Sequence, residues 1–489
     1  MGLFLTLLYI LTAYLGPDTL FGPLAEYHVE VIIALLALIA SLPSLPASGL
    51  FRMPQTYALI GLCGAVFMSF LFNGLTGLAP NALYESLPGP FTFFLIVLNC
   101  KKKRHLQMVV LVLLFASLFT IYKGFSALQS GDVFSPYLFT QGSDPNTAIY
   151  RIRGLSFIHD PNDFSQLMVS LIPCLFFFWR PKSSPLNFVV VLLPMGLLLF
   201  GMYLTHSRGA IIAFLAVVVI AGRRKIGTLL SLIISAGLFA ITTVVGWSGG
   251  REISVEAGSD RMEAWSVGLS LIKSHPIFGV GFQRFGEYFI ITAHNTIVVC
   301  AAELGMVGLF FWAMFVIPAF RDALTANMVP KSEEELAREE EEKTPFERSL
   351  KERAARMGRS PESASTRPSR DGARYDVQDS SIAVANPYFI GALENTDQLS
   401  ELEIRRLARL QMISLAGYLV AGWFLSRAYV MTLFIYGGMI QVVYQSALNQ
   451  GFVPPRLAIS RVIRLSAIAA VGLIAVVYIM LRLQHLMPA

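Results

Sequence analysis

The stretch KKKRHLQMVVLVLLFASLFTIYKGF, residues 101–125, decides the class of fold because it joins a basic cluster to a long apolar run. Four consecutive basic residues, Lys101 to Arg104, precede an apolar segment from Leu106 to Phe125. A segment of roughly 20 apolar residues crosses a bilayer as an α-helix, and basic residues gather at its cytoplasmic end. The stretch therefore predicts a transmembrane helix that enters the membrane from the cytoplasm.

Apolar runs of this kind recur along the whole chain. Of its 489 residues, 55% are hydrophobic and 14% charged, whereas soluble domains carry roughly 25% charged residues. The runs predict an all-α fold, a polytopic transmembrane bundle of about 12 to 13 helices. Besides the segment already quoted, they lie near 1–15, 29–42, 57–72, 91–98, 164–179, 188–204, 210–221, 227–247, 296–320, 413–425, 429–447 and 462–481.

The basic clusters between the runs predict the orientation of the bundle. They occupy alternate loops, so one assignment places all of them in the cytoplasm and the N-terminus inside. Loops 126–162 and 247–294 then open on the extracytoplasmic side, together with the short connection at 205–209. Because membrane orientation accounts for the net charge of +6, no nucleic-acid partner is predicted. The clusters are Arg52, Lys101–Arg104, Arg180–Lys182, Arg223–Lys225 and Arg456 with Arg461.

Residues 321–408 interrupt the pattern and predict a charged cytoplasmic insertion. The segment contains the acidic runs Glu333–Glu335 and Glu339–Glu342, followed by a stretch rich in Ser, Pro and Arg. This composition buries too little apolar surface to order itself, so we expect partial disorder, with docking of a cytoplasmic partner as the alternative. The domain plan is then a bundle over 1–320, the insertion over 321–408 and C-terminal transmembrane helices over 409–489.

Several arginines gather on the predicted outer face. Arg208 lies in the five-residue connection Thr-His-Ser-Arg-Gly, beside Ser207, at a helix end where a charge needs an anionic or polar partner. The planar guanidinium binds phosphate oxygens bidentately, so two arginines facing one cavity suit a diphosphate without a metal. Snorkelling to phospholipid headgroups is the alternative for any single one. The others are Arg153, Arg251 and Arg261.

His294 is the residue on this face best suited to proton transfer. With Asn295, it stands just before a long apolar run, and its ordinary pKa near 6.5 allows it to take a hydroxyl proton at neutral pH. A satisfied structural histidine is the alternative. Glu303 lies about two and a half helical turns further on, so we expect it to face away from His294 and to order the bundle.

No metal, cofactor or disulfide is predicted from the remaining residues. The four cysteines lie in or beside apolar runs without metal-ligand spacing. Gly279-Val-Gly-Phe lacks the third glycine and the preceding strand of a dinucleotide loop. His159-Asp-Pro-Asn-Asp163 could hold a metal, but this pattern is more typical of a turn and helix N-cap.

Taken together, these motifs resemble the O-antigen ligase and Wzy-type polymerase family. The resemblance covers roughly residues 151–320 in order and spacing: Arg-Gly-Leu-Ser-Phe from 153, Thr-His-Ser-Arg-Gly from 205, Ser-Asp-Arg-Met-Glu-Ala-Trp from 259, Gly-Val-Gly-Phe from 279, and His-Asn followed by Glu-Leu-Gly from 294 to 305. The long insertion and the helix count depart from the family.

The resemblance implies a transferase that moves a glycan from undecaprenyl diphosphate to an acceptor on the extracytoplasmic face of the bacterial inner membrane. It assigns the carrier diphosphate to Arg208 and Arg261, and the activation of the acceptor hydroxyl to His294. Arg153, Arg251, Ser207 and Asn295 are expected to bind substrate. The acceptor, whether a glycan, lipid A core or a protein, stays open.

Two other functions are possible on the sequence. A transporter of anionic solutes should show internal repeats and broken helices at mid-membrane in both halves, and we see no such pair. A scaffold could instead recruit other polysaccharide-assembly proteins through the insertion. In either case membrane lipids surround the bundle.

Overall fold

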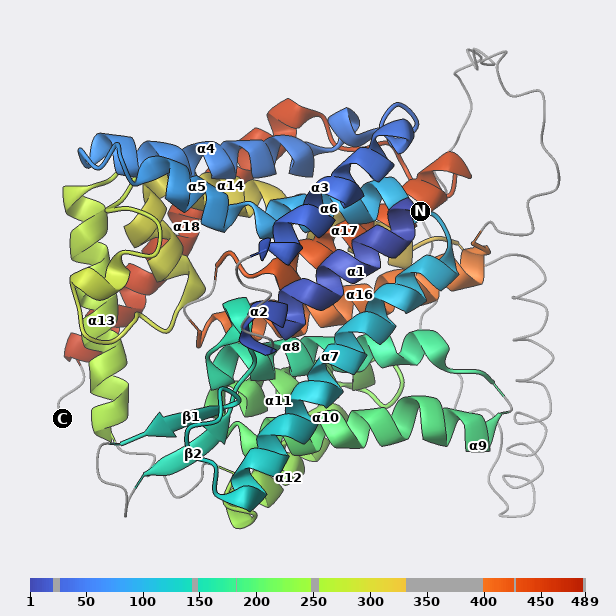
Figure 1. Ribbon diagram of the computed structural model, residues 1–489, viewed down its shortest axis with the longest axis horizontal. Helices are drawn as coiled ribbons and strands as arrows, with labels where there is room; N and C mark the ends of the chain where they lie inside the picture. Colours follow the sequence, from blue (N-terminus) through green and yellow to red (C-terminus); the bar gives the residue numbers. More distant parts are fainter. Residues whose placement is uncertain are drawn as a thin grey trace, which may run out of the picture.

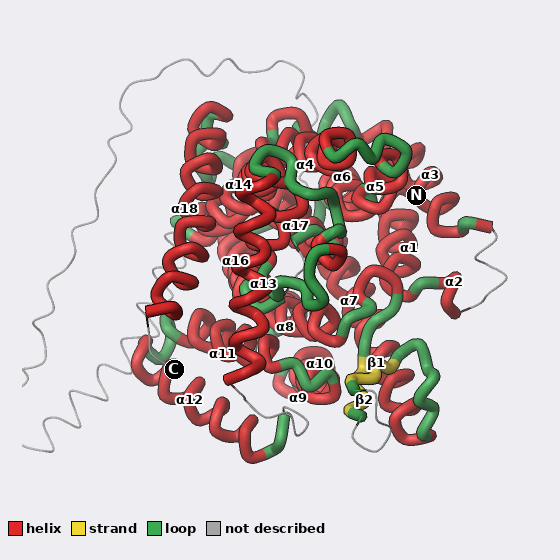
Figure 2. Tube along the Cα trace, turned by 90° about the vertical axis from the view of Figure 1, so that its left-hand side faces the viewer, coloured by secondary structure: helices red, strands yellow, loops and turns green. Residues whose placement is uncertain are grey.

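The structure, a computed structural model, describes residues 1–20, 27–142, 148–181, 183–247, 255–330, 399–425 and 428–486. Helices make up most of this part of the chain, and its two short strands lie side by side (Figures 1 and 2). β1 (Leu138–Gln141) pairs antiparallel with β2 (Ile149–Ile152), with Leu138 opposite Ile152. The all-α prediction is confirmed.

The helices follow one another with short connections, as expected of a membrane bundle. Those before the sheet are α1 (Gly2–Leu15), α2 (Pro17–Leu20), α3 (Val29–Ser41), α4 (Pro54–Phe72), α5 (Ala79–Ser86), α6 (Pro88–Asn99) and α7 (Lys103–Ser130). Those after it are α8 (Pro161–Leu175), α9 (Ser184–Asn187), α10 (Leu193–Leu204), α11 (Arg208–Gly222), α12 (Thr228–Val244), α13 (Val255–Ser274), α14 (Thr296–Asn327), α16 (Glu401–Gly422), α17 (Met431–Asn449) and α18 (Ile459–Leu486).

Within the described residues, five helical segments are long and apolar enough to cross a membrane. Four shorter apolar helices, α1, α3, α11 and α12, accompany them, and each needs flanking residues to complete a span. The chain is therefore a polytopic membrane protein, and the count of about 12 to 13 spans stays a prediction. The five segments are 54–72, 103–130, 184–204, 296–327 and 459–483.

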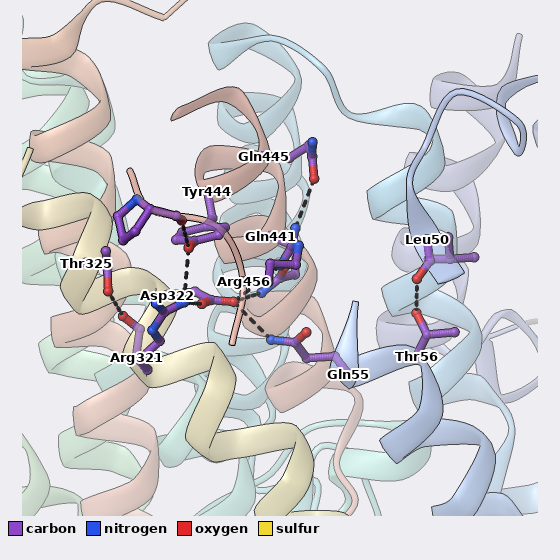
Figure 3. A network of polar contacts seen from close by, with 11 residues as sticks. Leu50, Gln55, Thr56, Arg321, Asp322, Thr325, Gln441, Tyr444, Gln445 and Arg456 are labelled. Carbon is purple, nitrogen blue, oxygen red and sulfur yellow. Dashed lines mark hydrogen bonds and ion pairs between the residues drawn. The ribbon is translucent and has the colours of Figure 1, made fainter. Parts of the chain in front are cut away.

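A buried carboxylate holds α14 to its neighbours (Figure 3). Asp322 is 2% exposed and accepts hydrogen bonds at Oδ2 from Gln55 Nε2 at 3.3 Å, Gln441 Nε2 at 3.0 Å and Arg456 Nη1 at 3.4 Å. Its Oδ1 accepts from Arg321 Nη1 at 3.0 Å. A buried charge is costly unless it is paired and hydrogen-bonded, so this network fixes α4, α14, α17 and the segment before α18 in one arrangement.

The predicted cytoplasmic clusters meet at one end of the bundle. Lys103 forms a 2.6 Å ion pair with Glu403, and Arg409 Nη2 donates to the carbonyl of Ala221 at 3.1 Å, one residue before the end of α11. Both Glu403 and Arg409 lie on α16, which begins at Glu401 within the predicted insertion and continues beyond it. The sheet and α13 lie toward the left of Figure 1, whereas α9 lies toward the right. The bundle thus has a strongly basic end and an end that carries the predicted site.

Candidate functional site

Arg151 on β2 joins three separate segments at the end of the bundle that carries the sheet and α13. Its side chain is 4% exposed, and Nε donates to the carbonyl of Thr205 at 2.7 Å. Nη2 donates to Asn162 Oδ1 at 3.0 Å, and Nη1 to Gln141 Oε1 at 3.3 Å. A guanidinium can satisfy several acceptors at once because its donors form a rigid fork. Arg151 therefore fixes the sheet, the 205–209 connection and the start of α8 relative to one another.

The 205–209 connection places Arg208 at the first position of α11. Ser207 is fully buried and is the N-cap, with Oγ accepting from the backbone N–H of Ala210 at 3.4 Å. The positive end of the helix dipole lies here, so the helix terminus and the Arg208 cation both favour an anionic partner. The local sequence thus builds a positively charged point at this end of the bundle.

α13 brings Arg261 to the same place. Trp265, one turn further along α13, donates from Nε1 to the carbonyl of Ala293 at 2.7 Å and so fastens α13 to the segment that carries His294. The pKa of Arg261 is lowered, first by burial and then by the positive charge of Arg208. Burial lowers the pKa of Arg151 as well; the negative charge of Asp160 opposes this lowering, and the positive charge of Arg208 adds to it. Arg151, Arg208 and Arg261 thus act on one another electrostatically, and we name them the cationic cluster.

His294 borders this cationic cluster. It precedes α14 with a left-handed backbone (φ 45°), while Asn295 caps the helix by accepting from the N–H groups of Ile297 and Val298. The pKa of His294 is lowered to about 4, first by burial and then by the positive charge of Arg261. Arg151 adds to this lowering, and Asp160 opposes it. His294 is therefore neutral at physiological pH and can accept a proton.

A cavity of about 740 Å³ opens beside His294. Its wall comes from α1, α3, α5, α6, the 156–163 segment, the 282–294 loop, the start of α14, Leu425 and residues 428–431. We name it the central cavity. Of the three predicted catalytic residues, His294 lines it, whereas Arg208 and Arg261 do not. The site therefore has two parts, the cationic cluster and the central cavity. His294 lines the cavity directly, and the charges of the cationic cluster act on it electrostatically.

The glycine motifs join the loop before α14 to a break within that helix through backbone hydrogen bonds. Gly305 breaks α14 with φ 66° and ψ −168°, which frees carbonyl groups in the preceding turn. Val280 and Gly281 donate their N–H groups to the carbonyls of Ala302 and Glu303 at 3.0 and 2.9 Å. A Cβ at Gly279 (φ 65°) would lie 2.3 Å from the Glu303 carbonyl carbon. The Gly-Val-Gly motif is thus a support for the broken helix, in agreement with the rejection of a dinucleotide loop.

Glu303 lies at the wall of the central cavity. His294 lines the same cavity, and the expectation that the two residues face apart stays a prediction. His294 itself lies outside α14 in a left-handed conformation, where helical spacing does not set its direction. Glu303 is 5% exposed and accepts from the N–H of Phe285 at 3.4 Å, which agrees with a role in ordering the loop.

The substrate-binding candidates divide into several groups. Arg153 donates to the carbonyl of Pro136 at 3.0 Å near the surface, and the structure places Arg151 in the cluster instead. Ser207 and Asn295 serve as helix N-caps, and any contact with substrate is untested. Arg251 lies outside the described residues.

Sequence reasoning missed two residues of the site. Arg151 stands two positions before the candidate Arg153, and only the acceptors that it reaches on other segments, the Thr205 carbonyl and Asn162 Oδ1, show that it is the buried one. Asp160 accepts from the N–H of Asn162 at 2.7 Å, as the predicted N-cap, and also lines the central cavity. Within the described residues, no group of three or more His, Cys, Asp or Glu is arranged to hold a metal ion.

The fold and this site define a multi-pass membrane protein with a cationic, histidine-containing centre at one end of its helices. A family model described as O-antigen ligase matches residues 193–313, the segment that contains Arg208, Arg261, His294 and Glu303. This match confirms the resemblance seen in the motifs over residues 193–313, and it supports a glycan transferase of the O-antigen ligase type. No curated protein sequence matches the chain.

Proposed function

We propose that the chain transfers a glycan from undecaprenyl diphosphate to an acceptor hydroxyl, at the extracytoplasmic face of the bacterial inner membrane. The observation that supports this most directly is the position of His294, a histidine kept neutral between the cationic cluster and the central cavity. Such a residue can take a proton from an acceptor on one side while arginines hold an anionic leaving group on the other.

The cationic cluster suits the donor diphosphate. Its three guanidinium groups are partly or fully buried, and the charge of Arg208 lowers the pKa of both Arg151 and Arg261 by repulsion, while Asp160 offsets part of this repulsion at Arg151. A diphosphate would relieve that repulsion and could be held through bidentate contacts. Arginines would then neutralise the leaving group in the role that a divalent cation has in other diphosphate enzymes.

The reaction balances with these groups alone. The acceptor oxygen bonds to the anomeric carbon of the donor sugar, and the bond from that carbon to the diphosphate oxygen breaks. The leaving diphosphate keeps the electron pair and is stabilised by the cationic cluster. His294 receives the proton of the acceptor hydroxyl and later returns it to solvent.

The orientation of the site is part of the proposal. The basic residues Lys103, Arg409 and their neighbours meet at the end of the bundle away from the sheet and α13, and basic residues favour the cytoplasmic side. The cationic cluster would then face the periplasm or cell exterior. Lys and Arg are generally enriched in cytoplasmic loops, so arginines on the opposite face are an exception to that rule. Such an exception is expected where the arginines bind a ligand.

Purified protein in nanodiscs tests the assignment through binding and transfer measured separately. We expect Arg208→Lys and Arg261→Lys to weaken donor binding, because lysine keeps the charge but loses the planar fork. His294→Ala should retain donor affinity and lose transfer by about 10²- to 10⁴-fold, the usual contribution of a general base. Glu263→Gln, an exposed position on α13, serves as the matched control. Transfer by His294→Ala at the unaltered rate would refute the assignment.

A further inference from the structure

The central cavity has an electrostatic character opposite to that of the cationic cluster. No lysine or arginine is among the described residues that line it, and its only basic side chains there are His159 and His294. Carboxyl groups, by contrast, reach it from four separate parts of the chain. They belong to Glu30 on α3, Glu85 on α5, Asp160 and Asp163 at the start of α8, and Glu303 on α14.

The rest of the wall combines aromatic rings with apolar side chains. Tyr9, Tyr84, Phe157, Phe285 and Tyr429 line the cavity, and its volume of about 740 Å³ lies within the range of pockets that enclose a small-molecule ligand. Flat rings pack against the carbon faces of sugars, and ionised carboxylates accept hydrogen bonds from hydroxyl or ammonium groups. The wall therefore matches a polyhydroxylated ligand.

Two residues mark the border between the two charged regions. Asn162 lines the cavity and also accepts the 3.0 Å hydrogen bond from Arg151 of the cationic cluster. His294 lines the same cavity, and the positive charge of Arg261 lowers its pKa. An anionic donor and a second substrate can thus occupy separate places on either side of His294, with no competition for the arginines.

We infer that the central cavity is the acceptor-sugar site and that its carboxylates select neutral or amine-bearing sugars over uronic acids and phosphorylated sugars. The inference rests on the proposed function for the identity of the ligand, the acceptor sugar, whereas the charge preference follows from the cavity wall alone. Its physical basis is that a second negative charge in a partly buried space among carboxylates is repelled, whereas a hydroxyl or ammonium group is not. Selection by repulsion of the wrong ligand is a general route to specificity.

Binding of three sugars with the same ring tests this selectivity. The probes are the methyl glycosides of N-acetylglucosamine, glucosamine and glucuronic acid, added to full-length protein in nanodiscs at pH 7 and measured by saturation-transfer NMR. We expect the first two to bind at least about tenfold tighter than the glucuronide, a difference of about 1.4 kcal/mol. Equal or tighter binding of the glucuronide, or no binding of any probe, would overturn the inference.

Variants connect the selectivity to the cavity wall. Glu85→Gln and Glu303→Gln should each reduce the ratio of the affinities for the glucosamine and glucuronic acid glycosides severalfold, because each removes one negative charge from the cavity wall. Glu85 is exposed, so its variant keeps the test valid if Glu303→Gln does not fold. Glu287→Gln removes an exposed carboxylate that does not line the cavity and should leave the gap unchanged. An equal effect from Glu287→Gln would contradict the assignment to this cavity.

Donor binding separates this inference from the proposed function. Farnesyl diphosphate, a short analogue of the carrier, should bind the unaltered protein and lose affinity in Arg208→Gln. If it does so while the three sugars show no charge preference, the acceptor-site inference fails and the proposed function stands. If farnesyl diphosphate binds equally well in Arg208→Gln, the proposed function fails, whatever the sugars show.

Discussion

The pH dependence of glycan transfer follows directly from the surroundings of His294. Burial, Arg261 and Arg151 lower its pKa from 6.5 to about 4, so the neutral, proton-accepting form persists into acid. An ordinary histidine would be about 76% neutral at pH 7 and about 9% neutral at pH 5.5. With a pKa of about 4, His294 would still be about 97% neutral at pH 5.5.

Transfer should therefore change little between pH 7 and pH 5.5, where a histidine with an unperturbed pKa would lose activity about eightfold. The measurement is kcat/KM from pH 4 to pH 8 in nanodiscs, since this parameter reports the pKa values of the free enzyme. We expect the acid limb to fall near about pH 4. An acid limb with an apparent pKa near 6.5 would refute the reasoning.

Arg261→Gln extends the test because it removes the larger of the two positive charges that lower the pKa of His294. The acid limb of the residual activity should move up from about pH 4 but stay below pH 6.5, because burial, the largest cause of the lowered pKa, remains. Arg153→Gln is the matched control, since Arg153 is not among the charges that act on His294. Histidine NMR without substrate reports the same shift in a variant too slow to assay. If the acid limb of kcat/KM in Arg261→Gln stays at the same pH, the cationic cluster does not lower the pKa of His294 and this reasoning is wrong.

Three further predictions concern stability, metal dependence and topology. In the unfolded chain His294 takes up a proton near pH 6.5, whereas in the folded chain it stays neutral down to about pH 4. The free energy of unfolding should therefore decrease as the pH falls from about 6.5 to about 4. Thermal melts at a series of pH values measure this, and the same pH dependence in His294→Ala would contradict it. Transfer should continue in EDTA, because the arginines of the cluster replace a cation, and a loss restored by added Mg²⁺ would count against that role. A thiol introduced at Gly258 should react with a membrane-impermeant reagent in intact cells, and reaction only after permeabilisation would reverse the orientation.

Much of this molecule could be predicted from local sequence. Long apolar runs interrupted by basic clusters specify membrane helices, because the bilayer requires every backbone group in its core to be hydrogen-bonded within a segment. Caps were predictable for the same local reason: Asp160 accepts from the N–H group of Asn162, as its position before Pro161 suggests. The spacing of the motifs around Arg208, Arg261 and His294 also indicated the family that the comparison with residues 193–313 confirms.

Other features depend on contacts between residues far apart in the chain. Nothing local distinguishes Arg151 from Arg153, because the burial of Arg151 results from the pairing of β2 with β1 and from an acceptor at Thr205. Glu303 and His294 line the same cavity, although His294 has a left-handed backbone outside α14, where helical spacing does not apply.

The electrostatic division of the site was decided only by the tertiary structure. The sequence by itself determined that the chain is a helical membrane protein, and it predicted that arginines and a histidine lie in outer loops, since hydropathy and charge are properties of short segments. It did not determine that Glu30, Glu85 and Glu303, which lie on three different helices, line one cavity. Cavities and pKa shifts arise from distance and burial, and these exist only once separate helices pack together.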